Sequence, residues 1–364
     1  MMSFEDFKQN VADSIKNHLP EKYEDAEISI STMTKNNDTK LTGITLKQEE
    51  GNVSQCIYLN DYYKAYEEGA DLDELIGKLA EIYVSNDNKE YDVNQLTDFE
   101  AVKDKISCRV INAEHNEEYL KDKPHTDIED LAVVYSVVLG KDNDGVYSIM
   151  VDDRMLNSYG ITVDELHETA VENLSKQDVS FKTMRDTVME MMFPNGFSEN
   201  GPFMAMMMPP EDAVPDIYVL TNDAGLYGAS EILNTPFMDE IATQLGGDYI
   251  VLPSSVHETL IVPMSEDLDR EALENMVQEV NVGAVRPEDR LSDHVYQYDS
   301  KNHELVRMDK MEERQQAKEA AQENRKEEKT SLMDRISKKQ DEIAKKDTAH
   351  EHKPPTKKRE EALA

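Results

Sequence analysis

The near-continuous apolar run Leu131–Leu139 constrains the fold of this chain more than any other feature. Only Ser136 interrupts it, it is rich in valine, and it has the length of a strand. A strand that is apolar on both faces needs both faces covered, so we expect it at the centre of a sheet. The run is also far shorter than the ~20 apolar residues that a membrane-spanning helix needs.

Segments on either side of this run alternate between strand and helix patterns. Asp142–Gly145 has turn residues, and Val146–Val151 can pair back on the run to give a hairpin. Thr162 then caps a helix over Val163–Leu174. Such strand pairs and helices recur along the chain. They predict an α+β fold with mixed or antiparallel sheets flanked by helices.

An internal duplication is also expected. Gly69-Ala-Asp-Leu-Asp-Glu-Leu75 opens a helix after a strand, a turn, a strand and a short helix. Ninety-one residues later, Gly160-Ile-Thr-Val-Asp-Glu-Leu166 opens a helix after the same order of elements. In each copy the glycine ends one helix, and Asp71 or Thr162 caps the next. The pattern predicts a repeated unit of a β-hairpin followed by two helices.

A change in composition near residue 309 divides the chain. Residues 1–308 carry 62 acids and 24 bases, a net charge of about −38, whereas residues 309–364 carry 14 acids and 15 bases. The latter segment is rich in helix-forming residues but too poor in apolar ones for a core. We expect an α+β unit at 1–122, a second at 123–308, and a charged helical or disordered tail.

The acidic body limits the kinds of partner. It repels phosphate backbones, anionic lipid and other acidic proteins, so direct nucleic-acid binding and membrane binding by the body are not expected. It suits solubility, a basic protein partner, or mimicry of nucleic-acid charge. The N-terminus lacks the pattern of a signal peptide, and Cys56 and Cys108 stand alone. We expect a cytoplasmic protein.

Motifs for catalysis or metal binding are incomplete. A zincin helix needs a second histidine four residues after the first, but Val171 follows His167 and Ile261 follows His257 at that spacing. Ser254-Ser255 lacks both glycines of a nucleophile elbow. We therefore expect no metal site and no cofactor.

One loop is the first choice for a small-ligand site. The segment Asn222–Ser230 joins a strand to a helix and is rich in small residues, the topology that binds phosphate at a helix N-terminus. It has no lysine, and an aspartate in it would repel phosphate. Loop geometry alone is the alternative explanation of its glycines. The candidate residues are Asn222, Asp223, Gly225 and Gly228.

A methionine-rich segment is the candidate partner surface. Residues 184–208 hold eight methionines, and methionine suits surfaces that accept varied apolar partners. A core segment followed by a loop would show the same composition. The residues expected to contact a partner are Met204, Met206, Met207 and Met208.

A set of short motifs resembles an uncharacterised bacterial family, number 5688 among the domains of unknown function. The motifs are Arg109-Val-Ile-Asn112, Asn116, Leu120, Pro124-His125, Asp130-Leu-Ala-Val-Val-Tyr135, Ala170-Val-Glu-Asn173-Leu174, Tyr227-Gly-Ala, Leu252-Pro-Ser-Ser and Glu288-Asp-Arg-Leu-Ser-Asp-His-Val-Tyr296. The resemblance covers roughly residues 1–300. It implies a bacterial cytoplasmic protein, of a family common in gut Firmicutes and often carried on mobile elements. It supplies no mechanism.

Three hypotheses of function follow. The first is a non-enzymatic binding or regulatory protein with a protein partner. The second is an enzyme with an active site outside the known motifs, for which the candidate polar cluster is Asn112, His125 and Asp130. The third is a mimic of nucleic acid that inhibits basic DNA-binding proteins. The sequence leaves the oligomeric state open.

Overall fold

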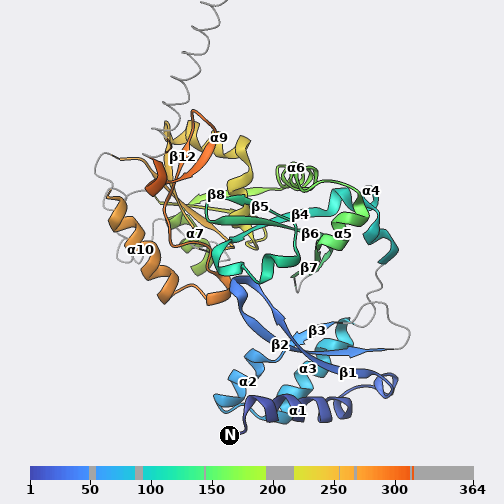
Figure 1. Cartoon of the computed structure of the whole chain (residues 1–364). Coiled ribbons are helices and arrows are strands. Elements are labelled where there is room, and N and C mark those ends of the chain that lie inside the picture. The colour runs from blue at the N-terminus through green and yellow to red at the C-terminus, as the bar shows by residue number, and fades with distance from the viewer. Residues whose placement is uncertain are drawn as a thin grey trace, which may run out of the picture. The chain divides into compact units, whose positions relative to one another are not determined.

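The computed structural model describes residues 1–48, 55–86, 93–142, 145–193, 217–253, 255–265, 269–311 and 314. The chain forms two compact units, Met1–Met308 and Asp309–Ala364. Nearly all of the second unit, and with it the tail expected from the sequence, lies outside the described residues. In the first unit the described strands form three sheets in which every pairing is antiparallel, so the α+β class is confirmed (Figure 1).

The first sheet has the order β1-β2-β3 and carries its own core. Its strands are β1 (Glu27–Thr34), β2 (Lys40–Lys47) and β3 (Cys56–Tyr58), and its helices are α1 (Phe4–Ser14), α2 (Asn60–Glu67) and α3 (Leu72–Asn86). Figure 1 shows the helices on one side of this sheet. Phe7 and Val11, one helical turn apart on α1, are fully buried against Ile44 of β2 and its neighbours. We call this sheet and its three helices the N-terminal layer.

The second sheet is built around the valine-rich run. Strand β6 (Leu131–Asp142) lies between β4 (Ile106–Asn112) and β5 (His125–Ile128) and also pairs with β7 (Gly145–Met150). Residues 131–137 are each at most 1% exposed, so the predicted central strand with both faces covered is confirmed. Because β4 and β5 pair with the same strand, this sheet combines residues from both sides of position 122.

Two helices follow that hairpin, α5 (Asp153–Tyr159) and α6 (Val163–Leu174). Gly160 ends α5 with a left-handed φ of 68°, and Thr162 forms a capping box with Glu165 at the start of α6. In the N-terminal layer, Gly69 has a φ of 102° and Asp71 accepts hydrogen bonds from the first turn of α3. The local caps therefore match at both places, and the duplication itself stays a prediction.

The third sheet has the order β13-β12-β10-β11-β9-β8 among the described strands. Its members are β8 (Val179–Thr183), β9 (Tyr218–Asn222), β10 (Tyr249–Leu252), β11 (Thr259–Pro263), β12 (Tyr296–Asp299) and β13 (Glu304–Arg307), accompanied by helices α7 (Met184–Met192), α9 (Thr235–Leu245) and α10 (Arg270–Gly283). Tyr249 and Val251 point into a core shared with the second sheet, whereas Ile250 and Leu252 pack with Val277 of α10. No described helix is both long and apolar enough to span a membrane.

A hairpin tip joins the N-terminal layer to the other two sheets. The tip between β1 and β2 is Asn36–Asp38, in which Asn37 and Asp38 have left-handed φ angles of 56° and 49°. Asn116, fully buried, donates to Asn36 Oδ1 at 3.0 Å and to Asn37 Oδ1 at 3.1 Å, and its own Oδ1 accepts from the Asn37 N–H at 2.8 Å. The same nitrogen also lies 2.8 Å from Asn112 O, so its two hydrogens are shared among three acceptors that hold the amide in place.

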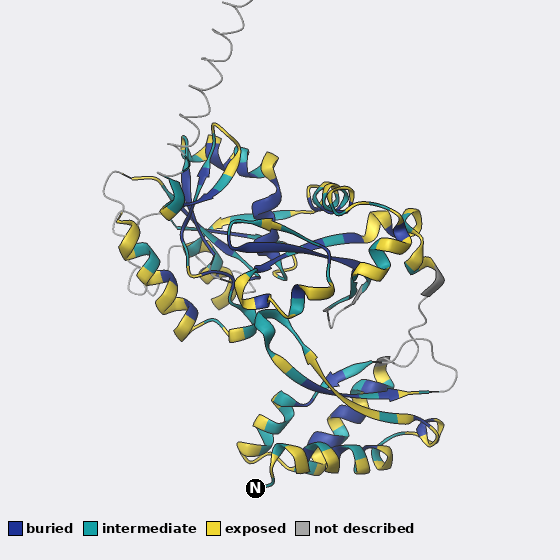
Figure 2. Cartoon of the chain, in the orientation of Figure 1, coloured by how far each residue is buried: buried dark blue, intermediate teal, exposed yellow. Residues whose placement is uncertain are grey.

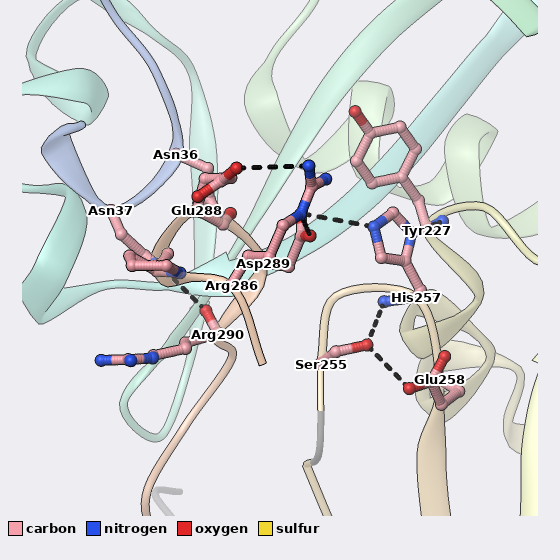
Figure 3. Close-up of polar contacts among 11 residues, drawn as sticks. Asn36, Asn37, Tyr227, Ser255, His257, Glu258, Arg286, Glu288, Asp289 and Arg290 are labelled. Atoms are coloured by element: carbon pink, nitrogen blue, oxygen red, sulfur yellow. Dashed lines mark hydrogen bonds and ion pairs between the residues drawn. The ribbon is translucent and has the colours of Figure 1, made fainter. Parts of the chain in front are cut away.

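The tip also reaches the loop around the short helix Pro287–Asp289. Asn36 Nδ2 donates to Glu288 O at 2.6 Å, and Asn37 Nδ2 donates to the main-chain oxygens of Pro287 and Arg290 at 2.7 and 2.8 Å. Figure 3 shows the two asparagines beside this loop. The tip therefore contacts two distant segments. It bonds to the end of β4 through Asn116, and it bonds to a loop that lies nearly 180 residues after β4 in the sequence.

Replacement of Asn116 by alanine should lower the free energy of unfolding by about 3 kcal/mol, because one buried and three part-buried polar groups lose their partner together. Urea unfolding followed by circular dichroism measures this. Asn10→Ala, on the exposed face of α1, is the matched control and should change stability by about 0.5 kcal/mol or less. Equal stability of the two variants would contradict the role assigned to Asn116.

Candidate functional site

The side chains of the three members of the candidate polar cluster have different partners. Asn112, at the end of β4, accepts from the His115 N–H at 2.7 Å and so closes the turn that follows the strand. His125 pairs with its own loop, Nδ1 to Lys123 O at 2.8 Å. It lies opposite Val134 on β6, whereas Asn112 lies opposite Leu131. The structure does not gather these side chains into one pocket.

Asp130 belongs to a different, buried network. Its carboxylate is 3% exposed, accepts from Ser292 Oγ at 2.7 Å, and accepts a short hydrogen bond from the Tyr296 hydroxyl. Arg307 Nη1 lies 3.6 Å from the same carboxylate. These contacts tie the β5–β6 turn to β12 and β13. Burial, followed by the charge of Asp130, raises the pKa of Tyr296 well above its ordinary value, so this hydroxyl stays a donor.

The loop chosen as a small-ligand site is bonded to itself and its neighbours. Asn222 Oδ1 accepts from the Leu226 N–H at 3.2 Å, and Asn222 O accepts from the Gly225 N–H at 3.0 Å. The N–H groups of Asp223 and Tyr227 bond to Asp178 O and to His257 Nδ1. These four amides are therefore engaged and do not form an open cradle for phosphate.

Gly228 has a packing role in the same loop. A Cβ at this position would lie 2.1 Å from Thr221 Oγ1 and 2.6 Å from His257 O. Thr221 Oγ1 in turn donates to His257 O at 2.7 Å. Glycine therefore allows the loop to approach the segment around His257 closely.

His257 is the centre of the polar site that the fold does assemble. Its Nε2 lies 3.3 Å from Asp289 Oδ1, and Arg286 Nε lies 3.0 Å from the other oxygen of that carboxylate (Figure 3). The side chains of His257 and Asp289 are 23% and 18% exposed, so solvent reaches both. We call His257, Asp289, Arg286, Ser255 and Tyr227 the His257 site.

Its hydrogen bonds determine what chemistry this site can do. His257 Nδ1 accepts from the Tyr227 N–H at 3.2 Å, so the ring proton is on Nε2 and is donated to Asp289. Ser255 Oγ lies 3.1 Å from Glu258 Oε1 and accepts from the His257 main-chain N–H at 3.0 Å. Ser255 therefore has no imidazole base, and both ring nitrogens of His257 are engaged.

An arginine and a tyrosine extend the site toward β4. The Arg109 guanidinium lies 3.8 Å from the centre of the Tyr227 ring, and Arg109 also donates to Ser148 Oγ at 2.6 Å. Tyr227 holds a left-handed φ of 56°, which turns its ring toward Arg109 and His257. The result is a half-exposed patch of polar and aromatic side chains that can bind, rather than a nucleophile with a base.

A buried carboxylate lies behind the loop. Glu231 is completely buried, and burial raises its pKa to about 7, although the Asn234 amide, 3.4 Å away, partly offsets this. One of its oxygens, Oε1, has no hydrogen-bond partner. Burial, followed by the charge of Glu231, raises the pKa of the Cys108 thiol to about 12, so this cysteine is not a nucleophile. Cys56 is half-buried, and both cysteines are free.

The candidate partner surface at Met204, Met206, Met207 and Met208 lies outside the described residues. The described start of the methionine-rich segment is α7, where Val188, Met191 and Met192 are 37%, 76% and 50% exposed. Met189 on the same helix is buried. Elsewhere in the described ranges, no group of three or more His, Cys, Asp or Glu side chains could hold a metal ion.

Sequence reasoning did not find the His257 site. His257 and Asp289 are separated by 32 residues, and neither belongs to a motif with a spacing of its own. His257 and Ser255 stood out only as parts of incomplete motifs, and Leu252-Pro-Ser-Ser and Glu288-Asp-Arg belong to the stretches that carry the family resemblance. The fold brings these two stretches together with Arg109 and Tyr227, from two further stretches of the same set.

Comparison with known proteins identifies the family. The model of a family of unknown function, DUF5688, matches residues 4–300, so the chain belongs to this family. The match spans the elements from α1 through β12 and ends before β13. No curated protein and no solved structure matches the chain.

Replacement of Glu231 by glutamine should change how stability depends on pH. A carboxyl whose folded pKa is raised from 4.5 to about 7 favours the folded state fully below pH 4.5 and progressively less as pH rises to about 7. Relative to pH 4.5, the wild type should lose about 3 kcal/mol at pH 8 through this group. The variant should lack this loss in urea unfolding. Glu240→Gln, exposed on α9, is the control and should keep the wild-type slope.

Replacement of Asp130 by alanine should lower the free energy of unfolding by about 3–5 kcal/mol, because it leaves buried donors and an arginine without their carboxylate. Asp127→Ala, exposed on the neighbouring strand, should have an effect of about 0.5 kcal/mol or less. Urea unfolding of the two variants side by side measures the difference. A small effect at Asp130 would show that the network contributes little.

Proposed function

We propose that the chain is a cytoplasmic binding or regulatory protein, without enzymatic activity of its own, whose partner is another protein. The observation that carries this proposal is the apolar surface of α7. Val188, Met191 and Met192 are exposed on one short helix, and methionine adapts its shape to varied apolar surfaces. Cys56 and Cys108 form no disulfide, which fits the reducing interior of a cell.

The charge of the chain favours a basic partner. Its formal net charge is −37, and complementary charge raises association rates and excludes acidic competitors. A partner with an apolar patch that contacts α7 and basic residues around that patch would match both the apolar surface of α7 and the acidic charge of the chain. Such an interface should weaken at high salt, because the long-range part of the attraction is screened.

The enzyme hypothesis takes second place. A general base needs an unengaged acceptor in reach of substrate, and His257 uses both ring nitrogens within the protein. The cluster of Asn112, His125 and Asp130 is distributed over a turn, a loop and a buried network. The half-exposed His257 site remains the place where a substrate would have to bind.

The test is site-directed capture from a lysate of the native host. A photo-crosslinking residue at position 191 should capture a basic protein, and Met191→Glu with Met192→Glu should reduce retention at least tenfold, because charge is buried in the contact. Met276→Glu with Val282→Glu adds the same charge to exposed apolar positions of α10 and is the matched control.

Retention should fall as salt rises from 50 to 500 mM. Retention that is equal for both double variants would show that α7 is not the contact. A chain cut after Met308 separates the contribution of residues 309–364. Capture of nothing specific by any version would overturn the proposal.

A further inference from the structure

Strand β1 forms an open edge of the first sheet. It pairs over eight residues with β2, from Glu27 opposite Lys47 to Thr34 opposite Lys40. No described strand pairs with its other side. Six of its eight residues are exposed, and Figure 2 shows the strand as mostly exposed. One row of its main-chain N–H and C=O groups is therefore available to another strand.

The edge lacks the usual protection against pairing. Open edges are commonly blocked by charged side chains, proline or a bulge. Residues 28–34 read Ile-Ser-Ile-Ser-Thr-Met-Thr, with no charge and no proline, in a chain that is 32% charged. The pairing of β1 with β2 runs without a register shift. Two copies of so acidic a protein repel one another over most of their surface, and this uncharged strip allows close approach.

We propose that β1 pairs antiparallel with β1 of a second copy, about a twofold axis centred on Ser31. In that register Ser31 faces its own equivalent, Ile30 faces Thr32, and Ile28 faces Thr34. With the axis at a residue, even-numbered residues of one copy lie opposite even-numbered residues of the other. Opposite residues point to the same face, so the helix-covered faces of the two sheets lie on the same side. The two three-stranded sheets become one continuous sheet.

The ends of the strand favour this register. Glu27 begins β1 and Lys35 follows its last residue, so the twofold axis at Ser31 places Glu27 of each copy opposite Lys35 of the other. Both point to the face away from the helices, where Lys35 Nζ lies 4.7 Å from the centre of the Tyr58 ring. A parallel arrangement would instead place like charges side by side, which is unfavourable.

The apolar side chains of the edge also fit a second copy. Ile30 lies on the helix-covered face, opposite the fully buried Ile44, yet it is 37% exposed because nothing described covers its outer side. Met33 on the other face is 36% exposed. Pairing would bury part of both in each copy and satisfy the open row of main-chain groups.

Sedimentation equilibrium of the full chain tests the association. The wild type should show a concentration-dependent dimer, and Ile30→Lys should weaken it at least tenfold by placing a charge at the edge. Val280→Lys, at a position of similar exposure on α10, is the control and should dimerise like the wild type. A wild type that stays monomeric up to about 100 µM, or a dimer unaffected by Ile30→Lys, would overturn the proposal.

Cysteine crosslinking tests the register, in a background of Cys56→Ser. Ser31→Cys should form an intermolecular disulfide on mild oxidation, because the two positions face each other. Ser29→Cys should not, because its equivalents are about 13 Å apart in this register, beyond the reach of a disulfide. Ser29→Cys combined with Met33→Cys should crosslink again. Crosslinking by Ser29→Cys alone, or by none of the three, would overturn the register.

A charge reversal gives an independent check. Glu27→Lys should weaken the dimer by placing two lysines opposite one another, and Glu27→Lys with Lys35→Glu should restore it. Capture of a strand from a different protein, with no self-association, would count against a second copy as the occupant. The circular dichroism spectrum of each variant shows whether it is folded.

Discussion

The buried amide of Asn116 is the centre of the polar connection between the N-terminal layer and the rest of the first unit. The buried core of the N-terminal layer shares no residue with the core between the other two sheets, among the residues described. The connection between them is polar. Asn116 bonds to the hairpin tip, Asp38 of the tip accepts from the N–H groups of Glu118 and Tyr119, and the tip in turn bonds to the loop at 287–290. Apolar burial stabilises each part, and directional hydrogen bonds set how they join.

The same loop gives the His257 site its position. Asp289 belongs to the short helix whose carbonyls accept from Asn36 and Asn37, and its own side chain meets His257. The contact with the N-terminal layer and the polar site therefore share one segment. A displacement at the hairpin tip would move Asp289, which makes this loop a physical connection between the two.

Local sequence was sufficient for part of this fold. Valine content and length identified the central strand, and the caps at Gly160 and Thr162 were readable because they act within a few residues. The long-range pairs were not readable. Tyr296 and Asp130 are 166 residues apart, and His257 and Asp289 are 32 apart, so only the tertiary fold brings them together. The candidate trio of Asn112, His125 and Asp130 was close in sequence, but Asn112 and His125 lie on opposite sides of β6, and the Asp130 side chain belongs to a buried network of its own.

The side chains of the hairpin tip bond to the main chain of the loop at 287–290. The tip and the loop therefore differ in which amino-acid substitutions they tolerate. Asn36 and Asn37 donate to the carbonyl oxygens of residues 287, 288 and 290, which every amino acid carries. Side chains on the loop that make no contact of their own can therefore change as long as its backbone path is kept, a path that Pro287 helps to fix, whereas Asp289 is held by its contact with His257. Positions 36, 37 and 116 are more constrained, because each of these amides donates from its nitrogen and accepts on its oxygen at the same time.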